Sequence, residues 1–329
     1  MDAELGAEPD AERDAERDAE LDAELDAESA MRSYPRDRSL RVNHLQALGT
    51  HNSYHLAPEV TIPPWSYSHA PLDEQLGQQG VRQFELDIYE RDGELRVYHI
   101  ERFDPETNCQ TLRECLTVMS EWSARHPQHH PLLTLLEVKS IERSEAEIVN
   151  VLESLLRETW GEGRLLTPSA VKRDYQSLRA GLEAEGWPLL GEVRGTLLPV
   201  LHAGGALREA LLSRSLNDRL LFPDAYGDLE APFAAYHSIN DPIQSEALIR
   251  RVVEAGHLVR TRSDVDSEQI RTLDTSRGDR ALLIGAHWIS TDYPRVPTAD
   301  EYGFIIPGGS PSRCNPLTAP AECESSDIE

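Results

Sequence analysis

Several oxygen-bearing side chains stand where apolar runs of the sequence end. Glu85 and Asp87 are two residues apart in an alternating segment, so on a strand both point to the same face. Two neighbouring carboxylates repel each other unless a cation or a shared proton lies between them. Glu137 and Asn52 end two further apolar runs and would extend the set to four oxygen ligands. Such a set favours calcium or magnesium over zinc, and ordinary polar residues at strand ends are the alternative.

Two histidines accompany these oxygens. His51 directly follows the apolar run 45–48 and the Gly49-Thr50 pair, and His99 ends the segment 95–99. Imidazoles exchange protons near neutral pH, and two of them beside a cation suit phosphoryl transfer. Three other histidines lie in a proline-bounded segment after a predicted helix, where we expect a solvated surface: His126, His129 and His130.

Alternating strand and helix patterns must position these groups. Strands are predicted at residues 45–50, 81–89, 95–99, 132–138, 196–202, 234–238, 257–262 and 281–289. Helices are predicted at 111–125, 145–160, 169–184, 206–214, 243–255 and 268–277. Eight strands with mostly helical connections are typical of a closed or nearly closed parallel barrel. The link 90–94 is too short for a helix, so that joint is either a hairpin or a distorted strand–helix unit.

The charge is uneven along the chain. Of the net −26, residues 1–30 contribute −11, because 13 acidic side chains there face two arginines. We expect residues 1–33 to form a disordered acidic tail, and residues 40–325 to form one catalytic domain. Nucleic acid is excluded as a partner, since phosphate contacts need clustered Lys and Arg. Such a chain should not adhere electrostatically to anionic lipid without help from a cation.

The four cysteines fall into two close pairs, Cys109 with Cys115 and Cys314 with Cys323. Neither pair has zinc-site spacing, so we favour two short-range disulfides and an oxidising compartment over four buried thiols.

No window holds the roughly 18 apolar residues that a membrane span needs. A signal peptide is not visible either, which conflicts with an oxidising compartment unless the native start lies elsewhere or export takes another route.

Several of these motifs, in this order, resemble the catalytic region of phosphatidylinositol-specific phospholipase C, and most closely its secreted, calcium-dependent bacterial branch. The matching strings are Thr50-His51-Asn52-Ser53-Tyr54-His55, Gly80-Val81-Arg82, Glu85-Leu86-Asp87, Val97-Tyr98-His99, Leu136-Glu137-Val138-Lys139, Val259-Arg260-Thr261-Arg262-Ser263-Asp264, Ser290-Thr291-Asp292-Tyr293-Pro294 and Arg313-Cys314-Asn315-Pro316. The resemblance covers roughly residues 44–323.

The resemblance implies a distorted TIM barrel of the phospholipase C-like phosphodiesterase type. It implies cleavage of phosphatidylinositol to diacylglycerol and inositol 1,2-cyclic phosphate at a membrane surface. In this family pattern His51 contacts the phosphate and His99 is the general acid. A ligand such as Glu85 takes the proton of the inositol 2-hydroxyl. Calcium, in preference to magnesium, is implied at Asn52, Glu85, Asp87 and Glu137. We also expect a secreted monomer.

Three further residues are predicted to contact substrate. Lys139 shares the face of Glu137, Arg260 ends a later strand, and Asp292 follows another.

The first alternative function is a glycerophosphodiester or sphingomyelin phosphodiesterase of the same barrel type, for which the same metal pair would serve. The second is a secreted, non-catalytic protein that binds calcium or lipid, and the third is a structural calcium site in an unrelated protein.

Overall fold

The computed structural model describes residues 34–329 except 61, 266 and 309–310. The predicted acidic tail at 1–33 lies outside the described residues. Within them, eight strands run parallel. They are β1 (Leu45–Thr50), β2 (Gln83–Arg91), β4 (Leu132–Ser140), β5 (Leu197–Leu201), β6 (Phe222–Pro223), β7 (Tyr236–Ser238), β8 (Leu258–Arg262) and β9 (Trp288–Thr291).

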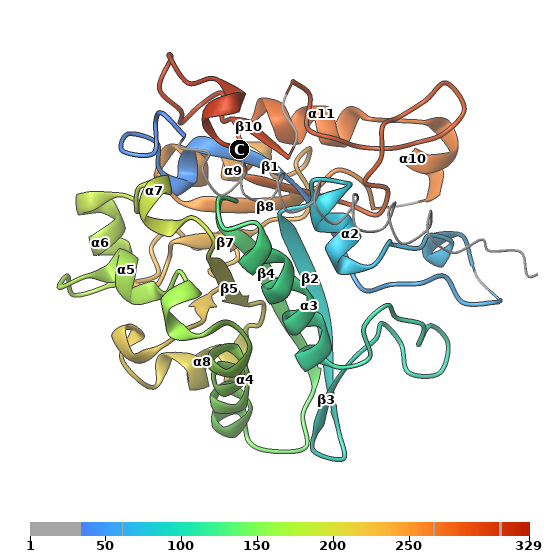
Figure 1. Cartoon of the computed structure of the whole chain (residues 1–329), viewed down its shortest axis with the longest axis horizontal. Coiled ribbons are helices and arrows are strands. Elements are labelled where there is room, and N and C mark those ends of the chain that lie inside the picture. The colour runs from blue at the N-terminus through green and yellow to red at the C-terminus, as the bar shows by residue number, and fades with distance from the viewer. Residues whose placement is uncertain (1–33, 61, 266, 309–310) are drawn as a thin grey trace, which may run out of the picture.

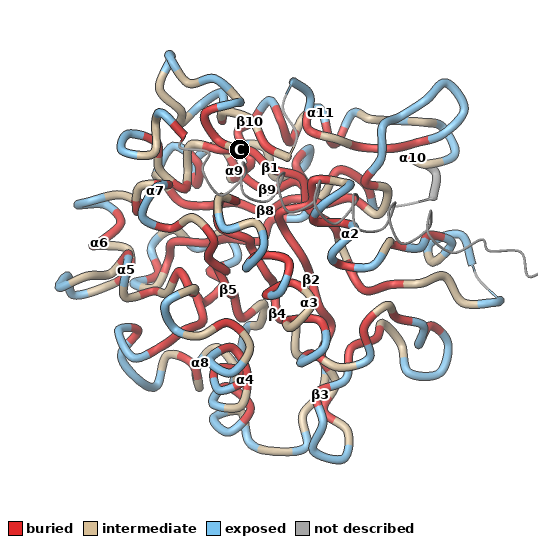
Figure 2. The backbone as a smooth tube through the Cα atoms, viewed as in Figure 1, coloured by how far each residue is buried: buried red, intermediate tan, exposed pale blue. Residues whose placement is uncertain are grey.

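The parallel strands form a nearly closed barrel. Their order is β6-β5-β4-β2-β1-β9-β8-β7, and an isolated parallel bridge between Asp224 and Tyr236 links the two ends. This arrangement confirms the α/β barrel expected from the alternation of strands and helices. Figure 2 shows that the backbone of the central strands is largely buried.

Two short strands lie outside the parallel set. β3 (Glu94–Val97) pairs antiparallel with β2, and β10 (Ser312–Cys314) pairs antiparallel with β1. The β2–β3 joint is therefore a hairpin, which projects at the bottom of Figure 1. Its turn residues Asp92 and Gly93 have φ of 52° and 76°, a conformation that Asp-Gly adopts readily. The predicted strand 95–99 therefore lies outside the barrel. The eighth barrel strand is instead β6, which has two residues and was not predicted.

Helices connect most of the strands. They are α2 (Leu72–Gly77), α3 (Leu112–Arg125), α4 (Glu145–Trp160), α5 (Pro168–Lys172), α6 (Leu178–Glu185), α7 (Leu190–Val193), α8 (Gly205–Leu212), α9 (Glu246–Glu254), α10 (Ser267–Thr272) and α11 (Ser276–Leu283). The predicted helix 169–184 is two helices. The predicted strand 281–289 was wrong in its first part, because its apolar run ends α11. Gly285, at φ 77°, separates α11 from β9. None of the described helices is long and apolar enough to cross a membrane.

Alternate residues of each strand serve two different layers. Phe84 and Leu86 pack with the helices in one buried cluster, whereas Leu133, Leu135 and Trp288 belong to a second cluster shared by the barrel strands. Because side chains alternate along a strand, Glu85, Asp87 and Glu137 project on the barrel side, above apolar layers. The strands therefore deliver polar side chains to one end of the barrel.

Both predicted disulfides are present. Cys109 and Cys115 are joined at 2.06 Å, and Cys314 and Cys323 at 2.00 Å.

One prediction near α3 was wrong. His129 and His130 are buried rather than solvated, and a hydrogen bond of 2.8 Å joins His129 Nε2 to Ser123 Oγ. The loop 126–131 is covered because Glu329 packs against its backbone and against Arg82.

Candidate active site

The paired register of β2 and β4 brings the predicted carboxylates together. Asp87 lies opposite Glu137, and Glu85 lies opposite Leu135. Asp87 is buried, and neither of its carboxylate oxygens has a hydrogen-bond partner. Lys139 Nζ lies 2.6 Å from Glu137 Oε1 and 3.4 Å from Asp87 Oδ2. Burial raises the pKa of Asp87 well above its usual range, although Lys139 opposes the shift. Lys139, which is shared with Glu137, therefore compensates this buried carboxylate only in part.

Glu85 is held differently. It forms a buried salt bridge with Arg260, whose Nη1 donates to Asn240 Oδ1 at 2.6 Å. Burial alone would raise the pKa of Glu85, but Arg260 and the other positive groups around it together lower the pKa to about 2. Glu85 is thus ionised at neutral pH, as a metal ligand must be, and is a weak base in this arrangement.

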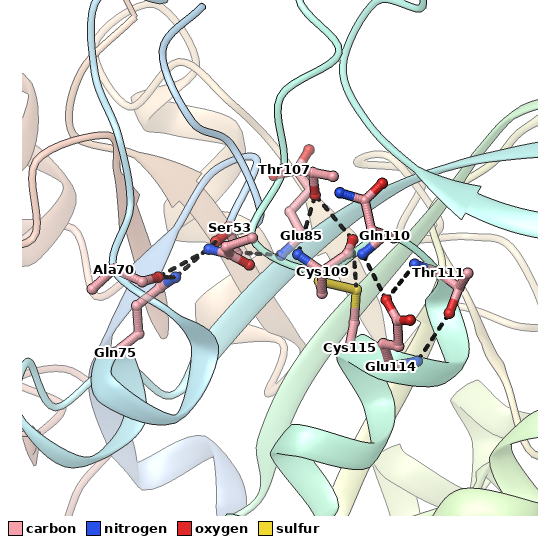
Figure 3. Close-up of a disulfide and its surroundings, with 11 residues drawn as sticks. Ser53, Ala70, Gln75, Glu85, Thr107, Cys109, Gln110, Thr111, Glu114 and Cys115 are labelled. Carbon is pink, nitrogen blue, oxygen red and sulfur yellow. Dashed lines mark hydrogen bonds between the residues drawn. A yellow bond between two sulfur atoms is a disulfide. The ribbon is translucent and has the colours of Figure 1, made fainter.

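The segment after β1 is fixed against β2. Asn52 is buried and has φ of 44°, a left-handed conformation that Asn tolerates better than most residues. Next to it, Ser53 Oγ accepts a hydrogen bond of 2.9 Å from the Glu85 backbone N–H, and the Ser53 N–H donates to Glu85 O at 3.0 Å. Figure 3 shows Ser53 between Gln75 and Glu85, in the same view as the Cys109–Cys115 disulfide. Asn52 is therefore positioned beside the Glu85 backbone.

His51 is tied to the neighbouring strand end. Its Nδ1 lies 2.9 Å from Asp292 Oδ1, and its Nε2 lies 3.3 Å from Arg262 Nη1. Since Asp292 can only accept and Arg262 can only donate, Nδ1 carries the proton and Nε2 offers a lone pair. Burial lowers the pKa of His51 well below its usual range, and the Arg262 charge adds to the shift. His51 is therefore a neutral imidazole at neutral pH.

His99 has a separate partner. Its Nδ1 lies 2.7 Å from Asp104 Oδ2, and the same carboxylate lies 2.9 Å from His55 Nε2. Asp104 and His55 are fully buried, whereas the His99 side chain is 25% exposed. Trp65 packs edge-on against His99, with ring centroids 6.0 Å apart. With Nδ1 turned to Asp104, the Nε2 atom of His99 is the one free to exchange a proton with a ligand.

A third imidazole, His202, stands beside the carboxylates. One of its ring nitrogens lies within 4.8 Å of carboxylate oxygens of Glu85 and Glu137. Its Nδ1 is 2.8 Å from Asp224 Oδ2. Burial lowers the pKa of His202, but the bond to Asp224 and the Glu85 charge outweigh it, and the net shift is upward. His202 is thus a polar group of the same barrel end.

Sequence reasoning missed several groups of this site. His202 had a signal, because it ends a predicted strand and shares the face of residues 198 and 200. Arg262 likewise shares the face of Arg260. Asp104 and His55 had no comparable signal, since both lie in irregular segments. The predicted substrate-binding residues Lys139, Arg260 and Asp292 all lie here, but each contacts a protein side chain.

The donor set fits a hard divalent cation. Carboxylate oxygens of Glu85 and Glu137 lie within 4.8 Å of one another and of a ring nitrogen of His202. Asp87 lies opposite Glu137, and Asn52 follows β1. Calcium prefers such oxygen ligands. A parallel barrel with these carboxylates and with histidines at its mouth is an arrangement that can support metal-assisted phosphoryl transfer.

The family model for calcium-dependent phosphoinositide phospholipase C matches residues 40–94 and 90–316. The chain therefore belongs to this family and is a phosphoric diester hydrolase. No curated protein matches the chain at a significant level.

Two solved structures with the same fold are bacterial calcium-dependent phospholipases C. The enzyme from Pseudomonas sp. is 19% identical with a TM-score of 0.63, over 85% of this chain and 97% of that one. The enzyme from Streptomyces antibioticus is 17% identical with a TM-score of 0.59, over 78% and 96% respectively. Both confirm the distorted TIM barrel.

Proposed function

We propose that the protein cleaves the glycerol–phosphate bond of phosphatidylinositol and releases diacylglycerol and inositol 1,2-cyclic phosphate. The observation that carries this is the pair of neighbouring imidazoles, His51 and His99, each with a carboxylate partner of its own, at the barrel end that also holds Glu85. The inositol headgroup is supported by the family and by the Pseudomonas enzyme, whose structure is also known as a myo-inositol complex.

The two imidazoles divide the proton transfers. The 2-hydroxyl oxygen of inositol attacks phosphorus and closes the cyclic diester, while its proton passes to a base. The lone pair of His51 Nε2, released when Arg262 turns to the phosphate, takes this role, because Glu85 is held in its salt bridge with Arg260. The phosphorus–oxygen bond to glycerol breaks, and the glycerol oxygen takes its electron pair and a proton from His99 Nε2.

Asn52, Glu85, Asp87 and Glu137 would hold Ca²⁺. When bound, the ion supplies charge neutralisation and lowers the pKa of a coordinated hydroxyl. Lys139 occupies part of this cluster through Glu137 and Asp87. Its Nζ would be displaced toward the phosphate, as the sequence predicted, once a cation compensates the carboxylates. Arg262 would offer N–H groups to the same phosphate, and Asp292 would orient His51 rather than bind inositol.

The substrate implies transient contact with a membrane. Phe103 is 69% exposed at the tip of the turn that follows His99, and Val60 is 87% exposed in the loop after β1. Apolar side chains on loops near the site suit contact with lipid rather than with water. The two disulfides favour a secreted protein, and we propose that it acts as a monomer.

The test is turnover of phosphatidylinositol vesicles with excess calcium and with chelator. His99→Ala and, as a matched control away from the carboxylates, His126→Ala are compared with the unaltered protein. We expect calcium-dependent release of inositol 1,2-cyclic phosphate, lost by about 10²–10⁴-fold in His99→Ala and retained in His126→Ala. Absence of any inositol phosphate under both conditions would overturn the proposal. Release of phosphocholine from sphingomyelin instead would support the first alternative.

A further inference from the structure

We propose that His55 is a positioning residue for the general acid, and that it acts through Asp104. The inference rests on the proposed function, because it assigns His55 to the step in which His99 protonates the leaving oxygen. Its basis is a chain of three buried or partly buried groups, His55, Asp104 and His99, that the sequence separates into two loops.

Asp104 is fully buried, and both of its oxygens face imidazole nitrogens. His55 Nε2 lies 2.9 Å from Oδ1 and 2.9 Å from Oδ2, and His99 Nδ1 lies 2.7 Å from Oδ2. No other side chain within the described residues bonds this carboxylate. Two imidazole N–H groups therefore supply the hydrogen bonds that a buried carboxylate needs.

The geometry leaves His55 no route to the substrate. Its side chain is completely buried, and its Nδ1 has no hydrogen-bond partner. Its ring packs against Tyr67 with centroids 4.3 Å apart. The backbone is fixed as well, because the His55 N–H donates to Asn52 O at 2.8 Å. His55 thus presents one functional atom, Nε2, and that atom faces Asp104.

The turn that carries Asp104 explains why this support matters. Residues 100–104 form a tight loop, closed by hydrogen bonds of 3.0 and 2.9 Å between Ile100 and Asp104. Phe103 at the tip of the loop is open to solvent. Without His55, one carboxylate oxygen would be buried and unpaired, and Asp104 would lose the contact that fixes its orientation toward His99.

A positioning defect at His99 has a specific kinetic signature. An alkoxide leaving group needs a proton as the phosphorus–oxygen bond breaks, whereas 4-nitrophenolate leaves without one. The test therefore compares kcat/KM for two soluble esters of inositol 1-phosphate, an alkyl ester and a 4-nitrophenyl ester, using the full chain with calcium. Their ratio does not depend on the fraction of folded enzyme.

We expect His55→Phe, which keeps a ring against Tyr67, to lower kcat/KM for the alkyl ester by about 10- to 100-fold. The 4-nitrophenyl ester should lose less than about 3-fold. His55→Gln should recover most of the alkyl activity, because its amide N–H can replace Nε2. Asp104→Asn should change the ratio in the same direction, and it serves as the second variant if His55→Phe does not fold.

The controls are His99→Ala, which sets the largest change in the ratio, and His287→Phe. His287 is also fully buried, but it precedes β9 and bonds Val259 N–H and Asn43 O at the opposite end of the barrel. His287→Phe should leave the ratio unchanged. Equal losses on both esters in His55→Phe, or no loss on either, would overturn the inference while the proposed function stands. Failure of the unaltered protein to cleave either ester would overturn the proposed function itself.

Discussion

The two histidines of the site lie in halves of different construction. The strand-built half holds His51 among Glu85, Arg260, Arg262 and Asp292, all at or just after β1, β2, β8 and β9. The loop-built half holds His99 between Asp104 and His55, which lie in irregular segments. Each half pairs an imidazole with a carboxylate. Only the strand-built half adds guanidinium groups to that pair.

The difference teaches how one fold separates two proton-transfer roles. Arg262 beside His51 favours the neutral ring, whereas the described hydrogen bonds of His99 join it to a carboxylate and to no cation. Strand ends place charged groups in fixed register, so oppositely charged side chains can be packed against each other. Loops offer no such register, and the loop-built half depends instead on one shared carboxylate and a nearby disulfide.

Among residues that support the two imidazoles, the largest expected effect comes from Asp292→Asn. An amide in place of the carboxylate no longer requires His51 Nδ1 to carry the proton, so the reactive tautomer is lost. We expect kcat to fall by about 10²–10³-fold. The fall should be equal for alkyl and 4-nitrophenyl esters, unlike that of His99→Ala. A preferential loss on the alkyl ester would show that the two halves do not divide the roles as described.

Arg260→Met tests the charge pairing of the strand-built half. Removing the guanidinium leaves Glu85 ionised and buried, which should cost about 3–5 kcal/mol of unfolding free energy in chelator. Excess calcium should restore much of this by replacing the lost charge. Denaturant unfolding with and without calcium measures both. The double variant Arg260→Met with Glu85→Gln is the control, and it should be more stable in chelator than Arg260→Met. A single variant within about 1 kcal/mol of the unaltered protein would contradict the prediction.

Removing the Cys109–Cys115 disulfide tests the loop-built half. Substitution of both cysteines by Ala should lower the unfolding free energy by about 2 kcal/mol, because the unfolded chain regains entropy. It should also lower alkyl-ester turnover, since the loop before Cys109 carries Asp104. The double Ala substitution at Cys314 and Cys323 is the matched control, expected to lose stability but to keep kcat. Equal effects on kcat would show that the first disulfide has no special role.

The smallest effect is a pH shift in Arg262→Met. Burial and Arg262 lower the pKa of His51, so loss of the charge should move that pKa upward. A base must be unprotonated, and activity should therefore decline at a higher pH on the acidic side of the profile. We expect a displacement of about half a unit to one unit in kcat against pH. A displacement to lower pH, or none, would contradict the cause assigned to the neutral ring.

Much of the site could be predicted because its signals are local. The two-residue spacing of Glu85 and Asp87 specifies a common face, and Glu137 lies on β4, which pairs with their strand. The β6 strand could not be predicted, since two residues carry no periodicity. The burial of His130 could not be predicted from the sequence either, because it depends on Glu329, almost 200 residues away in the sequence. The apolar residues 281–284 are compatible with a strand or with a helix. In the structure they end α11, and Gly285 follows directly after them.

By itself the sequence determined the alternation of strands and helices, the carboxylate set, the cysteine pairing and the family, since these depend on spacing or on contiguous motifs. Only the tertiary structure decided which carboxylate serves which histidine. Asp292 meets His51 across 241 residues because β1 and β9 are neighbours in the barrel. Asp104 meets both His55 and His99 because two loops converge. Such partners are fixed by the closure of the barrel, and the local spacing of residues carries no information about that closure.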